Sequence, residues 1–185
     1  VCVMSVLIAI KMKLTKEKIR QIAIGSLLHD MGYNLVKVNY QELNYIKCNK
    51  EEKRELMKHV VYGYSSVVKE SWLPAASKDI ILCHHERTGF PFHKKGDKIK
   101  IGSKIVSICD TFDSLVYGFM TPKIKVNDAL DYIVSQAGVK FDFEAVNCFV
   151  ELIAVYPNGT IVLTNEGEKA IVLRQNKKCP SRPIL

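Results

Sequence analysis

The chain has 185 residues, of which 48% are hydrophobic and 25% charged, and 27 Lys and Arg outweigh 19 Asp and Glu for a net charge of +8. This length fits one domain with a small appendage, and this composition excludes a mainly disordered, collagen-like or low-complexity chain. The basic balance favours anionic partners such as phosphates and nucleotides. A nucleic-acid polymer is not expected as the main ligand, because the sequence has no basic stretch interleaved with aromatic residues.

The first residues argue against membrane insertion and secretion. The apolar run over residues 1–10 is too short for a spanning helix, which needs roughly 20 apolar residues. No basic region precedes it and no small-residue cleavage site follows, so a signal peptide is not expected. The six cysteines form no C-x-x-C pair and are expected to be free thiols in a reducing compartment. We therefore expect a cytoplasmic location, within a larger sensor protein, because the chain starts without an initiator Met or a helix cap.

Helices are predicted over most of the chain, because apolar residues recur at helical spacing between Gly and Pro breaks. Thr15 is the expected N-cap of the second helix, and Gly32 is its expected end. Loops are expected at residues 31–48 and 86–100. The predicted helices cover residues 1–14, the stretch between Thr15 and Gly32, and residues 50–70, 75–85, 101–117, 126–136 and 141–155.

The pattern changes at Tyr156. Two β-branched runs, residues 160–163 and 170–173, flank a turn that contains Gly, which predicts a β-hairpin. An isolated hairpin is marginally stable, so it must pack on the helices or on a partner. We predict a mainly α fold, with a helical domain over residues 1–155 and a hairpin tail over residues 156–185.

Polar residues close three of the apolar helical stretches. His29-Asp30, His84-His85 and Cys109-Asp110 each follow an apolar run. Such groups are costly to bury unless they are paired or bind a metal, and helical proteins build dinuclear metal sites from inward-facing His and carboxylate ligands. A carboxylate beside a histidine can bridge two ions, and two ions about 3.5–4 Å apart suit phosphoester hydrolysis. One such histidine alone is more often structural than a ligand; their joint occurrence favours a metal site.

These motifs, taken together, resemble the HD-GYP branch of the HD superfamily. The order and spacing match over residues 1–149, whereas an HD pair alone would be a weak signal. The tail from Tyr156 is also similar to the short β segment that often follows such domains. The matching motifs are His29-Asp30-Met31-Gly32, His59 with Gly63, His84-His85-Glu86-Arg87, Gly89-Phe90-Pro91 and Asp110-Thr111-Phe112-Asp113.

The resemblance implies an HD-type helical bundle with two divalent metal ions, or three, iron or manganese. It implies hydrolysis of cyclic di-GMP to linear pGpG or to GMP through a metal-activated water. Asp30, Tyr33 and Asp113 would be catalytic residues, with Asp30 also bridging the metals. One metal would be held by His29, Asp30 and Asp110, and the second by His59, His84 and His85. The implied substrate-binding residues are Arg87, Gly89, Phe90, Pro91 and Lys123.

Departures from the family pattern keep several alternatives open. Tyr33 stands where the family usually has Lys, residues 117–125 contain no Arg, and a further His ligand would fall just before Val1. The readings are a cyclic dinucleotide phosphodiesterase, a catalytically weak module that binds a nucleotide or a partner protein, and another nucleotide phosphohydrolase of the superfamily. An upstream sensor domain and a diguanylate cyclase are the expected protein partners, and a homodimer is left open.

Overall fold

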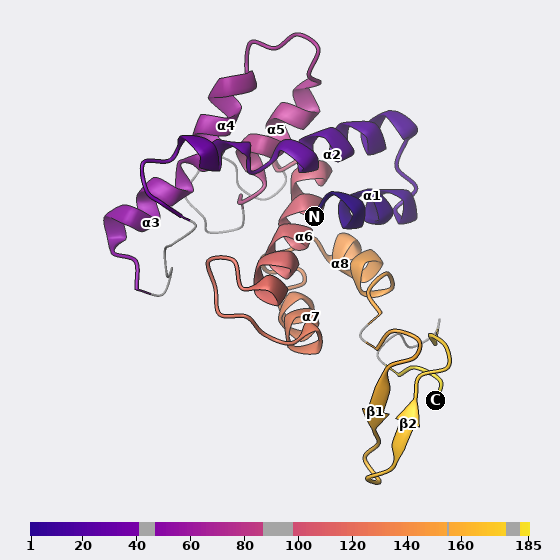
Figure 1. The fold of residues 1–185 in the computed structure, drawn as a ribbon. Helices are drawn as coiled ribbons and strands as arrows, with labels where there is room; N and C mark the ends of the chain where they lie inside the picture. The colour runs from indigo at the N-terminus through magenta and orange to yellow at the C-terminus, as the bar shows by residue number, and fades with distance from the viewer. Residues whose placement is uncertain (41–46, 87–97, 155, 177–181) are drawn as a thin grey trace.

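The computed structural model describes residues 1–40, 47–86, 98–154, 156–176 and 182–185 and shows a helical body followed by a β-hairpin (Figure 1). The predicted mainly α fold class is confirmed. Thr15 caps the second helix as expected, because its hydroxyl accepts a hydrogen bond from the Lys18 N–H at 3.3 Å. The helical elements are α1 (Cys2–Lys11), α2 (Lys16–Leu28), the 3₁₀-helix η1 (Met31–Leu35), α3 (Lys50–Met57), α4 (His59–Val67), α5 (Ala75–Cys83), α6 (Ile101–Tyr117), α7 (Val126–Ser135) and α8 (Phe143–Val150).

Helix α6 runs through the middle of the body, with α1, α2, α5, α7 and α8 packed around it (Figure 1). Its buried side chains are mostly apolar, and the facing helices contribute aliphatic and aromatic side chains to the same core. Burial of such side chains is the main stabilising term of the fold, worth about 1.5–3 kcal/mol for each one fully removed from water. The core residues with almost no exposed surface include Ile8, Ile80, Ile105, Ile108, Ile133 and Phe149.

One predicted helix, residues 50–70, is wrong as a single element. The chain forms α3 and α4 instead, with a break at Lys58. There the backbone forms a 3₁₀-type turn, in which the Lys58 N–H donates to the Glu55 carbonyl at 3.0 Å. The His59 ring then donates from Nδ1 to the Leu56 carbonyl at 2.7 Å. The break therefore turns His59 into the protein interior, where it is fully buried.

The last helix is shorter than the predicted span of 141–155. Asp142 accepts a hydrogen bond from the Ala145 N–H at 3.1 Å, so α8 begins at Phe143. It ends at Val150, where the Leu152 N–H donates to the Phe149 carbonyl one 3₁₀ turn back.

The predicted hairpin is confirmed as β1 (Ile161–Leu163) and β2 (Lys169–Ile171), which pair antiparallel with Ile161 opposite Ile171. One face is covered at its base, where Val172 is buried. The other face leaves four large apolar side chains exposed, so of the two expected supports, the helices or a partner, the described helices do not cover this face. The exposed side chains are Ile161, Leu163, Ile171 and Leu173.

Two further expectations concern the chain as a whole. Within the described ranges, none of the helices combines the length and the apolar character that crossing a bilayer requires. Five of the six cysteines are free thiols and Cys179 lies outside the described residues. The division into units at residues 155 and 156 stays a prediction.

Candidate metal centre

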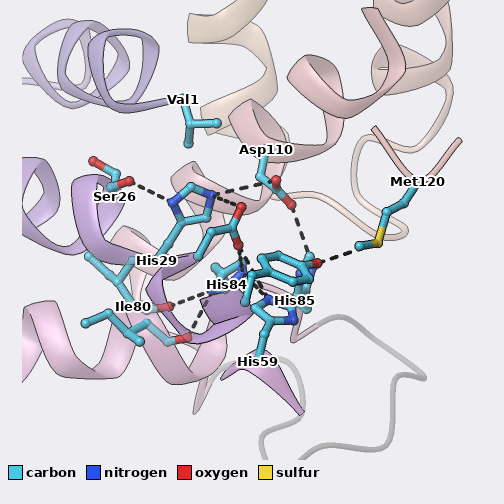
Figure 2. A network of polar contacts seen from close by, with 12 residues as sticks. Val1, Ser26, His29, His59, Ile80, His84, His85, Asp110 and Met120 are labelled. Atoms are coloured by element: carbon cyan, nitrogen blue, oxygen red, sulfur yellow. Dashed lines mark hydrogen bonds and ion pairs between the residues drawn. The ribbon is translucent and has the colours of Figure 1, made fainter. Parts of the chain in front are cut away.

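Six histidine and aspartate side chains that lie far apart in the sequence meet beside α6 (Figure 2). Five of them lie at helix ends, as predicted for His29, Asp30, His84 and His85, whereas His59 was expected inside a helix over residues 50–70. Asp110 differs, because it lies inside α6 rather than at its end. The helix continues to Tyr117, since Phe112 still packs in the core while Asp110 faces the histidines. The six residues are His29 and Asp30 between α2 and η1, His59 at the start of α4, His84 and His85 after α5, and Asp110.

Gly32 lets η1 lie directly on α4. A Cβ atom built on Gly32 would lie 1.9 Å from the His59 carbonyl oxygen and 2.6 Å from the Gly63 nitrogen. Any side chain at this position would therefore push the two elements apart. Since Asp30 precedes η1 and His59 begins α4, this close approach sets the distance between two of the six residues.

Three of the histidines are held in the same orientation by their own helix ends. Each ring donates its Nδ1 hydrogen to a backbone carbonyl about one turn earlier in the chain. His29 donates to Ser26 at 2.8 Å, His59 to Leu56 at 2.7 Å, and His84 to Ile81 at 3.1 Å. A hydrogen bond at one ring nitrogen fixes the proton there, which leaves Nε2 with its lone pair exposed. All three rings are thus set to ligate through Nε2.

The three Nε2 atoms converge on one carboxylate. Asp30 Oδ2 lies 3.1 Å from His29 Nε2, and Asp30 Oδ1 lies 3.5 Å from both His59 Nε2 and His84 Nε2. Each oxygen of Asp30 therefore faces a different histidine group. Asp110 also spans the site, with Oδ1 3.8 Å from His29 Nε2 and Oδ2 3.6 Å from His85 Nδ1 (Figure 2).

The polar atoms at the centre fit bound cations. Among the described residues, no hydrogen bond satisfies the buried atoms His29 Nε2 and Asp30 Oδ1. His59 Nε2 and His84 Nε2 lie 3.4 Å apart, so their two lone pairs face each other. Such an arrangement is costly in a buried site unless a positive charge lies between the groups. Imidazole nitrogen and carboxylate oxygen are also the donor set that divalent transition metals prefer.

Burial and charge tune the protonation of the site. Burial together with the neighbouring His84 lowers the pKa of His59 to about 4, and burial lowers the pKa of His85 well below its usual range. Both rings are therefore neutral near pH 7, as metal ligands must be. Burial would also lower the pKa of His29, but the Asp110 and Asp30 carboxylates outweigh it and raise that pKa to about 10, so without a cation this ring is protonated and a bound cation would have to replace its Nε2 proton. Their histidine partners, in turn, hold the pKa values of Asp30 and Asp110 below the usual range.

The donors form two groups that share Asp30. In each group, one ligand atom from every residue lies within 4.8 Å of the others. This arrangement offers two adjacent cation positions bridged by one carboxylate, which is the pattern that the sequence motifs imply. The two groups are Asp30 with His59, His84 and His85, and Asp30 with His29 and Asp110.

A cavity of about 400 Å³ opens beside the six residues. His85 and Asp110 form part of its lining, and Tyr33 lies at its edge, stacked on the His59 ring with centroids 4.1 Å apart. The tilt between these rings is 10°. The cavity is also lined by residues from α6, from α7 and from the connection between them that were not predicted as site residues, because no sequence motif marks them. Among these are Ser114, Phe119, Met120 and Tyr132.

The remaining predicted site residues are not gathered at the centre. Asp113 lies one turn after Asp110 on α6, in neither of the two ligand groups. Lys123 is exposed on the connection between α6 and α7 and does not line the cavity. The predicted substrate-binding residues Arg87, Gly89, Phe90 and Pro91 lie outside the described part of the chain.

Fold and site together define a helical protein whose helices bring together a cluster of His and Asp side chains that could hold divalent metal ions. Comparison with protein-family models identifies the family: a model described as HD domain matches residues 4–145. The chain belongs to the HD domain family, which confirms the resemblance drawn from the motifs.

Relatives with established names share this domain. A cyclic di-GMP phosphodiesterase of Pseudomonas aeruginosa is 26% identical over 182 residues, which are 95% of this chain and 43% of that protein. A cyclic di-GMP phosphodiesterase response regulator of Xanthomonas campestris pv. campestris is 28% identical over 149 residues, 78% of this chain and 39% of that protein. The chain thus spans less than half the length of these relatives.

A solved structure shows the same fold. It is a protein of Bdellovibrio bacteriovorus titled Bd1817, a HDG"Y"P protein, with a TM-score of 0.67 and 18% sequence identity. The match covers 80% of this chain and 48% of that one.

Proposed function

We propose that the chain is a metal-dependent phosphodiesterase that hydrolyses cyclic di-GMP to linear pGpG or to GMP. The observation that carries the proposal is Asp30, whose two oxygens face two separate histidine groups 3.1 to 3.5 Å away. The names of the two relatives support the choice of substrate. Iron or manganese is the proposed metal, since both accept mixed imidazole and carboxylate ligands.

Two bound cations would supply Lewis acidity at the phosphate and lower the pKa of an attacking water. The residues of the chain would position these cations. Asp30 holds the two positions together, and the carbonyl-bound rings of His29, His59 and His84 keep their Nε2 atoms directed at it. Buried rings cannot rotate away, so the ligand geometry is set before substrate binds. Asp113 is proposed to support Asp110 from the same helix.

The test is hydrolysis of cyclic di-GMP by the chain after anaerobic loading with Fe(II) or Mn(II). We expect linear dinucleotide or GMP as product from the native chain. Asp110→Asn should abolish turnover, because it removes a ligand charge from α6. Asp128→Asn is the matched control: it changes an exposed aspartate on α7 and should leave turnover unchanged. Metal-loaded native chain that forms no product contradicts the proposal.

One observation favours a second candidate, a module that binds a nucleotide or a partner protein with little turnover. In the described part of the chain, neither Lys nor Arg lines the cavity beside the metal centre, and neutral Tyr33 stands at its edge. Among the described lining residues, a phosphate there would find no cationic side chain to hold it. Tyr33→Lys separates the candidates: a large gain in kcat indicates a weakened phosphodiesterase, and no gain indicates a binding module.

The broader assignments stay proposals as well. A sensor domain upstream, a diguanylate cyclase as partner and a cytoplasmic location are each compatible with an HD domain that spans less than half of its named relatives. Whether two or three ions bind, and whether the chain dimerises, are to be measured with the metal-loaded protein.

A further inference from the structure

We propose that the cavity beside the metal centre is a subsite for an uncharged planar ring, the nucleobase next to the phosphate that is cleaved. The inference rests on the proposed function, because it places the phosphate at the two cation positions. It assigns the ring to an aromatic wall, by which we mean Tyr33, Phe119, Met120 and Tyr132.

The wall is an ordered aromatic assembly rather than a single exposed ring. Phe119 meets Tyr33 edge-on, with ring centroids 5.6 Å apart and planes at 89°, and the Tyr40 ring centroid lies 5.1 Å from that of Tyr33 and 6.4 Å from that of Phe119. The Tyr33 hydroxyl donates a hydrogen bond to Met120 Sδ at 3.7 Å. Aromatic faces and a polarisable thioether are the groups on which planar rings stack well. Because Tyr33 is held between His59 and these neighbours, the wall has a fixed position relative to the ligands.

Backbone strain marks the same place. Met120 has a φ of 55°, the left-handed conformation that residues other than Gly rarely adopt. This residue follows α6 by only a few positions and lines the cavity. Strained conformations persist where the surrounding structure holds them, and they cluster at ligand sites. In this conformation the Met120 sulfur lies within hydrogen-bond distance of the Tyr33 hydroxyl.

The charge of the residues that line the cavity favours the uncharged base of the substrate over its phosphate. The ionisable lining residues apart from tyrosine are His85 and Asp110, which are engaged at the metal centre. A phosphate in this cavity would face Asp110 with no Lys or Arg among the described lining residues, so an anionic group is disfavoured there. Hydroxyl groups on Thr111, Ser114 and Thr121 can instead bond to the polar edge of a base. A volume of about 400 Å³ also lies within the roughly 300–1,000 Å³ typical of ligand sites.

The experiment compares two ligands that differ by the base. Binding of GMP and of ribose 5-phosphate to the Mn(II)-loaded chain is measured by titration calorimetry. Because stacking on an aromatic side chain contributes about 1–3 kcal/mol per base, we expect GMP to bind at least about tenfold more tightly. Phe119→Ala should remove most of that preference and leave ribose 5-phosphate binding unchanged, and Phe119→Tyr should retain it.

Trp72→Ala is the matched control, since Trp72 is 65% exposed on the connection between α4 and α5, outside the cavity. It should leave the preference intact. Equal affinity of the native chain for the two ligands overturns the subsite, even if cyclic di-GMP is hydrolysed. A preference for GMP that Phe119→Ala abolishes supports the subsite. If that result is obtained but no phosphodiester is cleaved, the proposed function is wrong and the subsite stands.

Discussion

Replacing Gly32 by Ala tests the close approach on which the site depends. The added Cβ would lie 1.9 Å from the His59 carbonyl oxygen, and such contacts shorter than 3.0 Å are essentially never seen in proteins. The neighbour is backbone, so it cannot swing aside as a side chain would. The elements η1 and α4 must separate by about 1 Å, which at overpacked positions costs about 1–3 kcal/mol. We therefore expect the melting temperature to fall by about 2–12 °C, at roughly 2–4 °C per kcal/mol for a chain of this size.

The same substitution should weaken metal binding. Asp30 and His59 belong to the two elements that separate, and their atoms already lie 3.5 Å apart. Losses of 10- to 100-fold are typical when the support of a metal ligand is disturbed. The assay is thermal unfolding and Mn(II) titration of Gly32→Ala beside Gly138→Ala. Gly138 has a φ of 74° with nothing within 4 Å of the added carbon, so that variant reports backbone strain alone. Native metal affinity in Gly32→Ala would refute the reasoning.

Three further predictions concern stability and are measured by denaturant unfolding. Lys13 has a φ of 54° just after α1, so Lys13→Gly should raise the free energy of unfolding by up to about 1 kcal/mol, whereas Lys18→Gly inside α2 should lower it by a similar amount. Asp142→Ala removes both the cap of α8 and the 3.1 Å ion pair with Lys104, and should lower stability by about 0.5–2 kcal/mol; no loss would mean that the cap is not used. Phe149→Ala, at a fully buried core position, should cost about 3–5 kcal/mol, and a loss below 1 kcal/mol contradicts the packing described for α8.

The sequence was sufficient to select most of the candidate metal ligands, because they follow a local signal. His29 and His84 end apolar helical runs, and a polar side chain at such a place needs a partner. The hairpin was equally readable, since β-branched runs on both sides of a Gly turn allow few other structures. Asp110 does lie beside the histidines, but it was expected at the end of its helix and lies inside α6, because the apolar pattern alone does not show where a long core helix ends.

Other features depend on contacts that a linear pattern does not contain. The break at Lys58 arises because the His59 ring donates a hydrogen bond to the Leu56 carbonyl. Here the packing of the site outweighs the helix propensity of the sequence. The aromatic wall is similar: Phe119 and Met120 come from the connection after α6, and only the folded chain brings them to Tyr33. Lys123, chosen for its charge and position, instead lies exposed on that connection.

The central claim is that Asp30 joins two metal positions. Electron paramagnetic resonance of the Mn(II)-loaded chain, combined with metal content per chain, tests it most directly. The account predicts at least two ions per native chain with the spectrum of an exchange-coupled pair, and loss of that coupling in Asp30→Ala. A single ion with an isolated Mn(II) spectrum, or a coupled pair that persists in Asp30→Ala, would contradict it.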